Sequence, residues 1–383
     1  MLNWILPEYI EDILPPDATR IETLRRAVLD LFRTYGYDLV IPPLIEHIES
    51  LRSGTGQDMD LRTFKLVDQM SGRLLGLRAD ITPQVARIDA QLLNRRGIAR
   101  LCYAGSVLHT LPLGLTRTRE PLQVGADIYG HAGIESDIEI QKLMLDALDR
   151  IGAKKIHLDL GHVGVFRNIV RMSGMDDALE SELFQVLQAK DVPGIAGLSS
   201  QLDSRVREAL CLLPELYGGM DVLPRARSAL SAFPGVAQAL SELEAVADEL
   251  CVPDLSFDLA ELRGYHYHSG MVFAVYAENC PNAVALGGRY DEVGRAFGRA
   301  RPATGFSMDL RELASILPQA VQEDGILAPY SNDPVLQAKI AELRGAGERV
   351  VVDLPGHEAS RGELCCSRML ALCDGQWRIV ESD

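Results

Sequence analysis

The sequence lacks an excess of positive charge. Its 383 residues include 38 Lys and Arg against 54 Asp and Glu, which gives a net charge of −16. Nucleic-acid binding depends on a positive field that neutralises phosphates. The charge balance therefore argues against nucleic acid as the main partner.

A secretion signal and a membrane span are also lacking. The N-terminal stretch MLNWILPEYIEDILPP has no basic region followed by a long apolar run, and no segment reaches the length of a membrane span. The seven cysteines are odd in number and scattered, which is typical of reduced thiols. We expect a cytoplasmic protein with no membrane segment.

Motifs for nucleotides and metals are missing as well. The sequence has no G-x-G-x-x-G after a strand and no G-x-x-x-x-G-K-[ST]. Cys365, Cys366 and Cys373 cluster, but no matching Cys/His pair lies nearby at zinc-site spacing. We expect neither a cofactor nor a metal.

What is present is the pattern of an α+β protein. Hydrophobic residues make up 47% and charged residues 24%, as in a globular chain. Periodicity predicts helices over 17–36, 81–95 and 136–152, and a long antiparallel hairpin from 100–110 and 121–130. Residues from about 165 to 250 look mostly helical, and strands resume at 255–259, 270–277 and 302–307. We predict an antiparallel sheet flanked by helices and interrupted by a helical insertion.

The pattern changes after about residue 320. A strand at 325–329, a helix at 333–345 and a strand at 348–354 form one βαβ-like unit. We predict a main domain over 1–320 and a small C-terminal α/β extension over 321–383, too short for a rich α/β domain.

The segment RGYHYHSG, which begins at residue 263, contains two closely spaced histidines. On a strand, His266 and His268 share a face and Tyr265 and Tyr267 share the other. The pair could hold zinc, but spacing alone supplies no third or fourth ligand. The alternative is a polar pocket wall whose aromatic rings pack on the core.

Two other segments carry polar side chains. Asp80 and Thr82 follow a predicted strand, where they either cap a helix or accept a ligand ammonium. Gln123, Gly125 and Asp127 share one face of a strand, and the glycine allows a ligand to approach closely. This face is either solvent-exposed or the floor of a pocket.

A fourth segment, LGGRYD at 286–291, has two adjacent glycines. They form either a turn or a stretch of backbone that lines a site.

The order of LRADIT, QVGADIYG, RGYHYHSGMVF, GGRYDEVG and ATGFSMDL resembles that of histidyl-tRNA synthetase, over about residues 5–315. The resemblance implies a class II aminoacyl-tRNA synthetase-like fold, usually dimeric, with Pro43 in the dimer-interface motif. It also implies a histidine pocket. Residues matching Asp80, Thr82 and Gln123 hold the amino group, and residues matching Asp127 and His268 hold the imidazole. The pocket expected in this chain is formed by Asp80, Thr82, Gln123, Asp127, Arg263, Tyr267 and His268.

The chain departs from the synthetase pattern at several positions. Asp80 and Asp127 replace Glu, and His268 replaces Tyr. His109 and Glu312 stand where the family has the two arginines that clamp ATP. Fixed cations stabilise the phosphate charge that develops during adenylation, so we expect this activity to be lost. About sixty residues follow the main domain, against about a hundred in the family's anticodon-binding domain.

Together these departures resemble the regulatory subunits of ATP phosphoribosyltransferase, a paralogous family. That resemblance implies a non-catalytic subunit that acts in the first step of L-histidine biosynthesis. The expected partner is a short-form catalytic subunit in a hetero-oligomer, an octamer, with homodimerisation of this chain, L-histidine as feedback effector and no tRNA. Histidine would bind either the synthetase-like pocket or a subunit interface. The alternatives are a histidine-activating ligase acting on a non-tRNA carrier, a free-standing amino-acid sensor, and a zinc protein.

Overall fold

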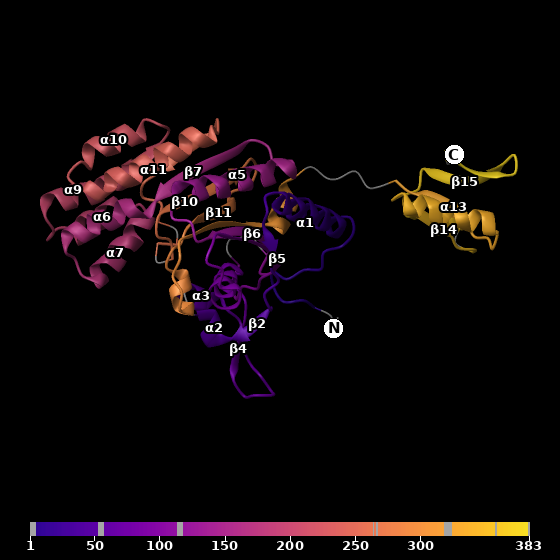
Figure 1. Cartoon of the computed structure of the whole chain (residues 1–383), viewed down its shortest axis with the longest axis horizontal. Helices are drawn as coiled ribbons and strands as arrows, with labels where there is room; N and C mark the ends of the chain where they lie inside the picture. Colours follow the sequence, from indigo (N-terminus) through magenta and orange to yellow (C-terminus); the bar gives the residue numbers. More distant parts are fainter. Residues whose placement is uncertain are drawn as a thin grey trace. The chain divides into compact units, whose positions relative to one another are not determined.

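The computed structural model describes residues 5–52, 57–112, 118–262, 264–265, 267–317, 324–356 and 358–381. The chain divides into two compact units, Met1–Leu317 and Pro318–Asp383 (Figure 1). The boundary that we predicted between 320 and 321 falls within 318–323, outside the described residues.

A nine-stranded sheet organises the described part of the larger unit, in the order β1-β5-β6-β12-β11-β10-β7-β9-β8. The β1–β5 and β7–β9 pairs are parallel and the central pairs are antiparallel. The predicted α+β fold with a mainly antiparallel sheet is therefore confirmed. The strands are β1 (Asp38–Leu39), β5 (Ala99–Ser106), β6 (Leu122–Tyr129), β7 (Ile156–His162), β8 (Tyr217–Gly218), β9 (Leu255–Asp258), β10 (Met271–Ala277), β11 (Ala283–Arg289) and β12 (Ala303–Asp309).

Three helices cover the back of this sheet: α1 (Asp17–Thr34), α5 (Ile134–Arg150) and α12 (Leu310–Ile316). Their apolar residues recur every three or four positions, so that one side of each helix is buried. In β6, Val124, Ala126 and Ile128 alternate onto the same core. The opposite face of β6 is left for polar side chains.

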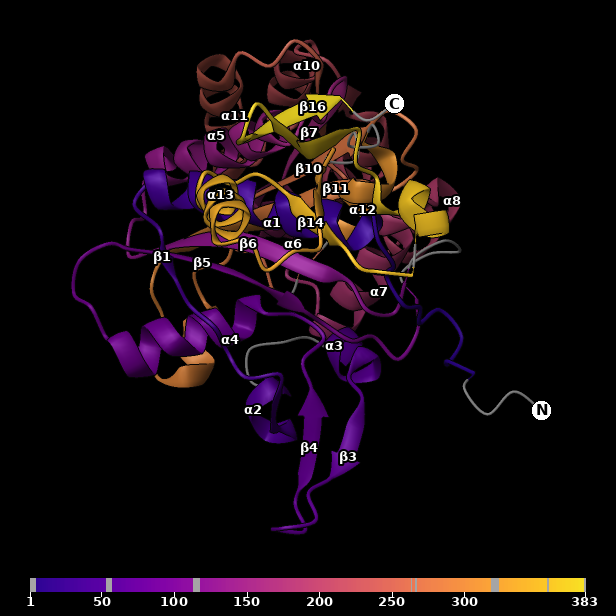
Figure 2. The ribbon, with the colours of Figure 1, turned by 90° about the vertical axis from the view of Figure 1, so that its right-hand side faces the viewer.

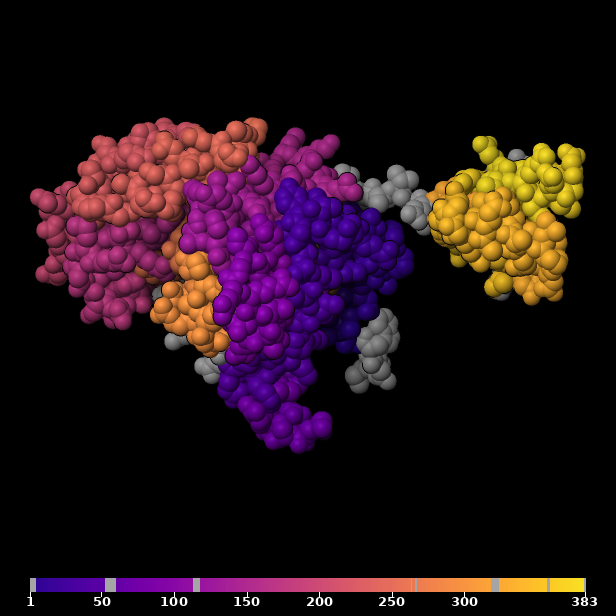
Figure 3. Space-filling model, viewed as in Figure 1, coloured from indigo at the N-terminus to yellow at the C-terminus, as the bar shows by residue number. Residues whose placement is uncertain are grey.

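The helical insertion begins directly after β7. Its helices are α6 (Val163–Ser173), α7 (Asp177–Gln188), α8 (Val192–Leu198), α9 (Ser204–Leu212), η2 (Leu213–Glu215), α10 (Val222–Ala229) and α11 (Pro234–Leu250). They form one mass beside the sheet (Figure 3). α6 and α11 contact each other and also strands β7 and β10, so the insertion shares the sheet's core.

Smaller elements lie over the front of the sheet. A three-stranded sheet in the order β2-β4-β3, within the described residues, ends in a hairpin that projects from the unit (Figure 2). The predicted helix over 81–95 divides into an α-helix and a π-helix. These elements are β2 (Ile45–His47), α2 (Ile48–Arg52), α3 (Gln57–Arg62), β3 (Lys65–Val67), β4 (Leu74–Leu77), α4 (Thr82–Arg87), the π-helix η1 (Ile88–Leu93) and η3 (Val293–Phe297).

The smaller unit has its own apolar core, which includes Ile326, Leu336, Ile340 and Leu370. Its described strands follow the order β14-β13-β15-β16. β13, α13 and β14 make the predicted βαβ unit, and an antiparallel hairpin extends it. The elements are β13 (Ile326–Pro329), α13 (Pro334–Gly345), β14 (Val350–Asp353), η4 (Glu358–Leu364), β15 (Arg368–Cys373) and β16 (Gln376–Glu381).

Two local predictions are corrected by the structure. Gly287 and Gly288 lie inside strand β11, so the turn interpretation is wrong. The described part of RGYHYHSG forms turns and bends, so the strand that would place Tyr265 and Tyr267 on one face is also wrong. Gly264 has φ of +65°, a conformation that side chains disfavour and that breaks strand geometry.

Candidate functional site

Asp127 lies at the centre of the sheet's front face, where glycines leave room above the strands. The register places Asp127 beside Gly305, and Gly305 beside Gly288. A Cβ at Gly305 would come within 1.9 Å of the Asp127 carboxylate and 2.5 Å of the Tyr290 hydroxyl. A Cβ at Gly288 would come within 2.8 Å of the His268 ring. The two glycines therefore allow Tyr290 and His268 to lie directly against the sheet.

The Asp127 carboxyl group is fully buried. Tyr290 donates a hydrogen bond to one of its oxygens, and the Tyr129 hydroxyl lies 3.4 Å from the other. Burial, with a smaller contribution from the nearby Asp80, raises the pKa of Asp127 to about 8 although the hydrogen bonds from Tyr290 and Tyr129 oppose the shift. The group therefore holds its proton at neutral pH until a cation or a proton acceptor reaches it.

Asp80 and Gln123 form a second polar cluster along the same face. The Gln123 amide donates to Asp80 Oδ1 at 2.7 Å and accepts from the Ile81 backbone N–H at 2.9 Å. Asp80 Oδ1 also accepts from the Thr82 N–H, and the Thr82 hydroxyl lies 3.0 Å from the Tyr103 hydroxyl. Asp80 precedes the N-cap residue Ile81, which has no side-chain cap hydrogen bond, so Asp80 is not the helix cap and belongs instead to a connected polar network.

The turn segment after Gly264 places its aromatic residues in different surroundings. Tyr267 packs on Tyr290 with ring centroids 5.1 Å apart, and its hydroxyl is buried with no hydrogen-bond partner among the described residues. His268 lies against Tyr267 and Tyr290, and burial lowers its pKa to about 4, so the ring is neutral. Arg263 and His266 lie outside the described residues.

Tyr265 points into the helical insertion instead. Its ring packs on Phe166 and Phe184, and its hydroxyl donates to Glu180 at 2.5 Å. Arg167 lies 4.9 Å over the same ring and donates to the Tyr265 carbonyl. One short segment therefore connects the polar cluster to α6 and α7.

His109, at the first clamp position, has become part of the interior. Its side chain is buried, and Nε2 lies 2.8 Å from the Ala79 carbonyl, so this nitrogen carries the donated hydrogen. Arg119, which follows in the same hairpin, donates to the His109 carbonyl and lies over the Phe64 ring. The His109 ring therefore fixes the backbone at Ala79, and the Arg119 guanidinium fixes the backbone at His109 and packs on Phe64.

Glu312, at the second clamp position, faces the turn between β10 and β11. Its carboxylate accepts from Asn282 and from the Cys280 thiol, both at 3.4 Å. The neighbouring Arg311 donates to the Glu120 carbonyl and to the Glu11 carboxylate. At the position where the resemblance leads us to expect a phosphate-clamping cation, the chain therefore has a carboxylate.

Six of the seven predicted pocket residues lie in the described chain. Each contacts another member of the front-face cluster, which we define as Asp80, Thr82, Tyr103, Gln123, Asp127, Tyr267, His268 and Tyr290, and only Arg263 lies outside the described residues. Sequence reasoning missed Tyr290 and Tyr103, which supply hydroxyls beside Asp127 and Thr82. The signal for Tyr290 was present, because it directly follows the glycine pair and arginine of LGGRYD.

Other site types receive no support from the described residues. They contain no group of three or more His, Cys, Asp or Glu side chains arranged to hold a metal ion. No helix in the described ranges has the length and apolar content to cross a bilayer. Two hollows of ≈ 400 and ≈ 450 Å³ lie beside the front-face cluster, toward the insertion.

Comparison with known families divides the chain at the same place as the structure. Residues 9–313 match the family described as histidyl-tRNA synthetase. Residues 323–380 match the family described as the ATP phosphoribosyltransferase subunit HisZ C-terminal domain.

Two relatives match over nearly their whole length. An ATP phosphoribosyltransferase regulatory subunit of Nitrosospira multiformis is 60% identical, over 100% of this chain and 99% of the relative. Its counterpart in Ralstonia pickettii is 57% identical, over 98% and 97%.

Solved structures show the same architecture. An ATP phosphoribosyltransferase regulatory subunit/histidyl-tRNA synthetase from Bacillus halodurans superposes with a TM-score of 0.84 at 25% identity, covering 96% of this chain and 98% of that one. The histidyl-tRNA synthetase of Nostoc sp. PCC 7120 has a TM-score of 0.78 at 17% identity, covering 100% and 97%. The predicted class II synthetase-like fold is confirmed.

Proposed function

The chain belongs to the family of ATP phosphoribosyltransferase regulatory subunits, and from this premise we propose that the front-face cluster is its L-histidine effector pocket. The family places the chain in histidine biosynthesis as a non-catalytic subunit that works in a complex with the catalytic ATP phosphoribosyltransferase. The pocket, the effector and the size of the complex are our proposals.

The supporting observation is the buried Asp127 carboxyl, whose pKa burial raises to about 8, together with the buried Tyr267 hydroxyl, which has no hydrogen-bond partner among the described residues. Buried polar groups without partners are costly, and an imidazole has one donor and one acceptor to offer them. The cluster of Asp80, Thr82 and Gln123 provides a carboxylate, a hydroxyl and an amide for the ligand ammonium. The two sets occupy one sheet face, which suits a single amino acid lying across it.

The geometry gives the ligase alternative no support. Adenylation needs cations on the phosphates, and here one clamp position holds a buried imidazole and the other a carboxylate. We propose that histidine binding in this chain is used for recognition and that the phosphoribosyl transfer takes place on the partner.

We further propose a homodimer that forms at the β1 edge and assembles with short-form catalytic subunits into a cytoplasmic hetero-octamer. β1 ends the large sheet, and Leu39 in β1 and Ile41 shortly after it are 53% and 82% exposed. Exposed apolar side chains at an unpaired sheet edge favour association. A net charge of −16 favours a protein partner over tRNA. Seven free cysteines suit a reducing compartment.

The test is reconstitution of this chain with the short-form catalytic subunit, followed by assay of ATP and phosphoribosyl pyrophosphate turnover. We expect turnover to require this chain and to be inhibited by L-histidine. Asp127→Ala should weaken histidine binding by roughly 10- to 100-fold, because it removes a buried hydrogen-bonding group. The exposed Asp149→Ala, on α5, is the matched control and should leave binding and inhibition unchanged.

Two outcomes would contradict the proposal. If Asp127→Ala and His268→Ala both retain histidine binding and inhibition, the effector binds elsewhere, such as at a subunit interface. If the isolated chain catalyses histidine-dependent pyrophosphate exchange, it is an active ligase.

A further inference from the structure

A polar cavity of ≈ 400 Å³ lies where the helical insertion meets the sheet. Its walls come from α6, α11, the start of α5 and the segment Ser269–Gly270 that follows His268. This volume is within the range of small-molecule sites. Neither the proposed histidine pocket nor the clamp positions use its side chains.

The two insertion helices that form the cavity run in opposite directions. Near the start of α6, His162 lies 3.0 Å from Glu242 of α11. Two turns later, Asn168 of α6 packs against Gly235, close to the start of α11, where a Cβ would come within 1.9 Å of the Asn168 side chain. Residues along α6 and α11 therefore define two separate ends of the cavity.

One end of the cavity is positive. Arg167 and Arg171 are four residues apart on α6, and both line the cavity. Like charges at this spacing repel each other. Arg171 makes no hydrogen bond or ion pair with the described residues, and the first turn of α11, which begins at Pro234, has no acidic residue. The partial positive charge of that helix start adds to the two arginines.

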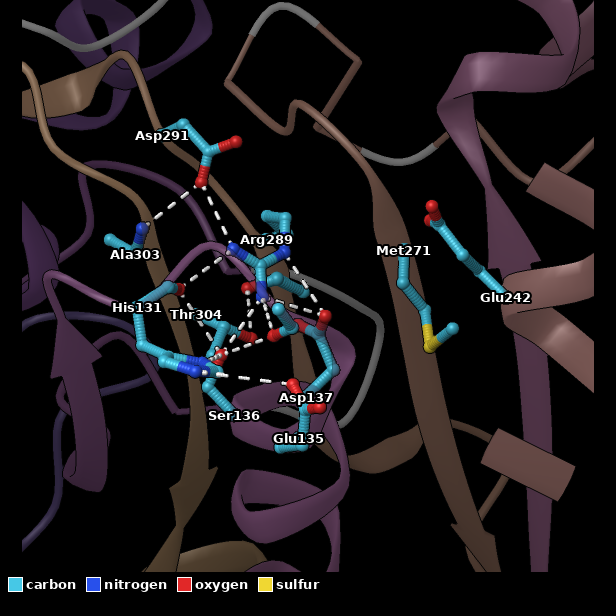
Figure 4. A network of polar contacts seen from close by, with 12 residues as sticks. His131, Glu135, Ser136, Asp137, Glu242, Met271, Arg289, Asp291, Ala303 and Thr304 are labelled. Atoms are coloured by element: carbon cyan, nitrogen blue, oxygen red, sulfur yellow. Dashed lines mark hydrogen bonds and ion pairs between the residues drawn. The ribbon is translucent and has the colours of Figure 1, made fainter. Parts of the chain in front are cut away.

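The other end is negative, and its groups are fixed in position. Arg289 is almost fully buried and pairs with Asp137 and Asp291, while Ser136 and backbone carbonyls take its remaining donors (Figure 4). Glu242 lies apart from this network (Figure 4). The His162 ring and the Gln238 amide hydrogen-bond to its carboxylate and orient it. The hydrogen bond from His162 lowers the pKa of Glu242, which keeps the carboxylate charged.

Formal charges in the lining are therefore balanced in number but separated in space. Three arginines face three carboxylates, and the two arginines without a carboxylate partner stand at the end away from Glu242. A ligand with one charge would leave the opposite end unmatched. A ligand with an anionic and a cationic end would match both.

We infer that this cavity is a second ligand site and that it takes a free amino acid with a cationic side chain. The ligand α-carboxylate lies at Arg167 and Arg171, where a bidentate contact suits guanidinium groups. Its side-chain cation lies at Glu242, because the α-ammonium is too close to the carboxylate to reach the other end. The site goes beyond the proposed effector pocket and does not depend on it.

The test uses the full chain carrying Asp127→Ala, which weakens histidine binding at the proposed pocket. Each of the twenty protein amino acids is screened singly by ligand-observed NMR, and the strongest is titrated by calorimetry. Inorganic phosphate serves as a probe that is only an anion. We expect an amino acid with a cationic side chain to bind at one site per chain.

Arg171→Gln and Glu242→Gln should each weaken that binding roughly tenfold or more, because each removes a charged partner. Arg150→Gln is the matched control, since Arg150 is an exposed arginine in the last turn of α5 and lies outside the cavity. Circular dichroism would check that each variant is folded.

Three results would overturn the inference. The first is that no amino acid binds in the Asp127→Ala background. The second is that Arg171→Gln binds as well as Arg150→Gln. The third is that phosphate binds as tightly as any amino acid and Glu242→Gln has no effect, which would make the cavity an anion site.

Discussion

Two sets of residues in the larger unit have different surroundings. In the proposed histidine pocket, Asp80, Gln123 and Asp127 hydrogen-bond to one another or to tyrosines. At the positions expected to clamp ATP, His109 bonds to a backbone carbonyl, and Glu312, on α12, accepts from an amide and a thiol. The comparison indicates that the groups proposed for recognition and those expected for activation are separate, so that one set can be lost while the other remains.

The largest effect should come from Asp127. Its folded pKa of about 8 lies above its ordinary value because of burial, so it stabilises the fold fully at low pH and less as pH rises toward 8. Asp127→Asn removes this titration. Between pH 5 and pH 9, the unfolding free energy of the wild type should fall relative to that of the variant by on the order of a few kcal/mol.

Urea unfolding of both chains at several pH values measures this difference. For Asp149→Asn, on the surface of α5, the curve of unfolding free energy against pH should be parallel to that of the wild type. If the curve for Asp127→Asn were also parallel, Asp127 would be ionised in the ligand-free protein.

The next effect concerns His109. If this residue is now structural, His109→Ala should cost about 2–3 kcal/mol, because it leaves a cavity and removes the partner of the Ala79 carbonyl. His157→Ala, at a half-exposed histidine, should cost clearly less. If His109→Ala and His157→Ala lost the same unfolding free energy in denaturant, the structural role of the buried His109 would be contradicted.

A smaller effect should follow from Tyr265→Phe, which removes only the hydroxyl that bonds to Glu180. We expect a loss of about 1 kcal/mol in stability. Glu180→Gln should give a similar loss, and the double variant should lose less than the sum if the two side chains act as a pair. Additive losses in thermal or urea unfolding would show that Tyr265 is not tied to the insertion through Glu180.

The smallest effect is expected at Glu312, which is half-buried and accepts from the Cys280 thiol and the Asn282 amide. Glu312→Gln should change stability by no more than about 0.5 kcal/mol. Glu312→Arg should not restore histidine-dependent pyrophosphate exchange, because the His109 position still lacks its cation. Measurable pyrophosphate exchange by Glu312→Arg would show that a single cation at this position is enough for activation.

Much of the fold followed from local patterns. Helical periodicity gave α1 and α5, and strand alternation gave β6 with a polar front and an apolar back. The hairpin of β5 and β6 was expected from two β-type runs around a turn-rich connection. β11 was missed because its glycines look like a turn in isolation, whereas pairing on both sides holds them in a strand.

The candidate site was only partly accessible in this way. The resemblance identified six residues that the structure describes, but the partner of Asp127 was missed because Tyr290 is 163 residues away in the sequence. The directions of Tyr265 and Tyr267 were also predicted wrongly. Alternation holds only on a strand, and the positive φ of Gly264 turns the chain there.

The sequence by itself determined which side chains are available: the acidic balance, the carboxylates and amides of the proposed pocket, and a histidine and a glutamate at the positions where the resemblance leads us to expect clamp arginines. Those are properties of residue type, which folding does not alter. Only the tertiary structure decided what these groups do. It buried Asp127 beside Tyr290 and raised the pKa of its carboxyl group. It also placed His109 in the interior, where its ring bonds to the Ala79 carbonyl, and separated opposite charges across the cavity between α6 and α11. Burial and proximity depend on residues far apart in the chain, so no local pattern could specify them.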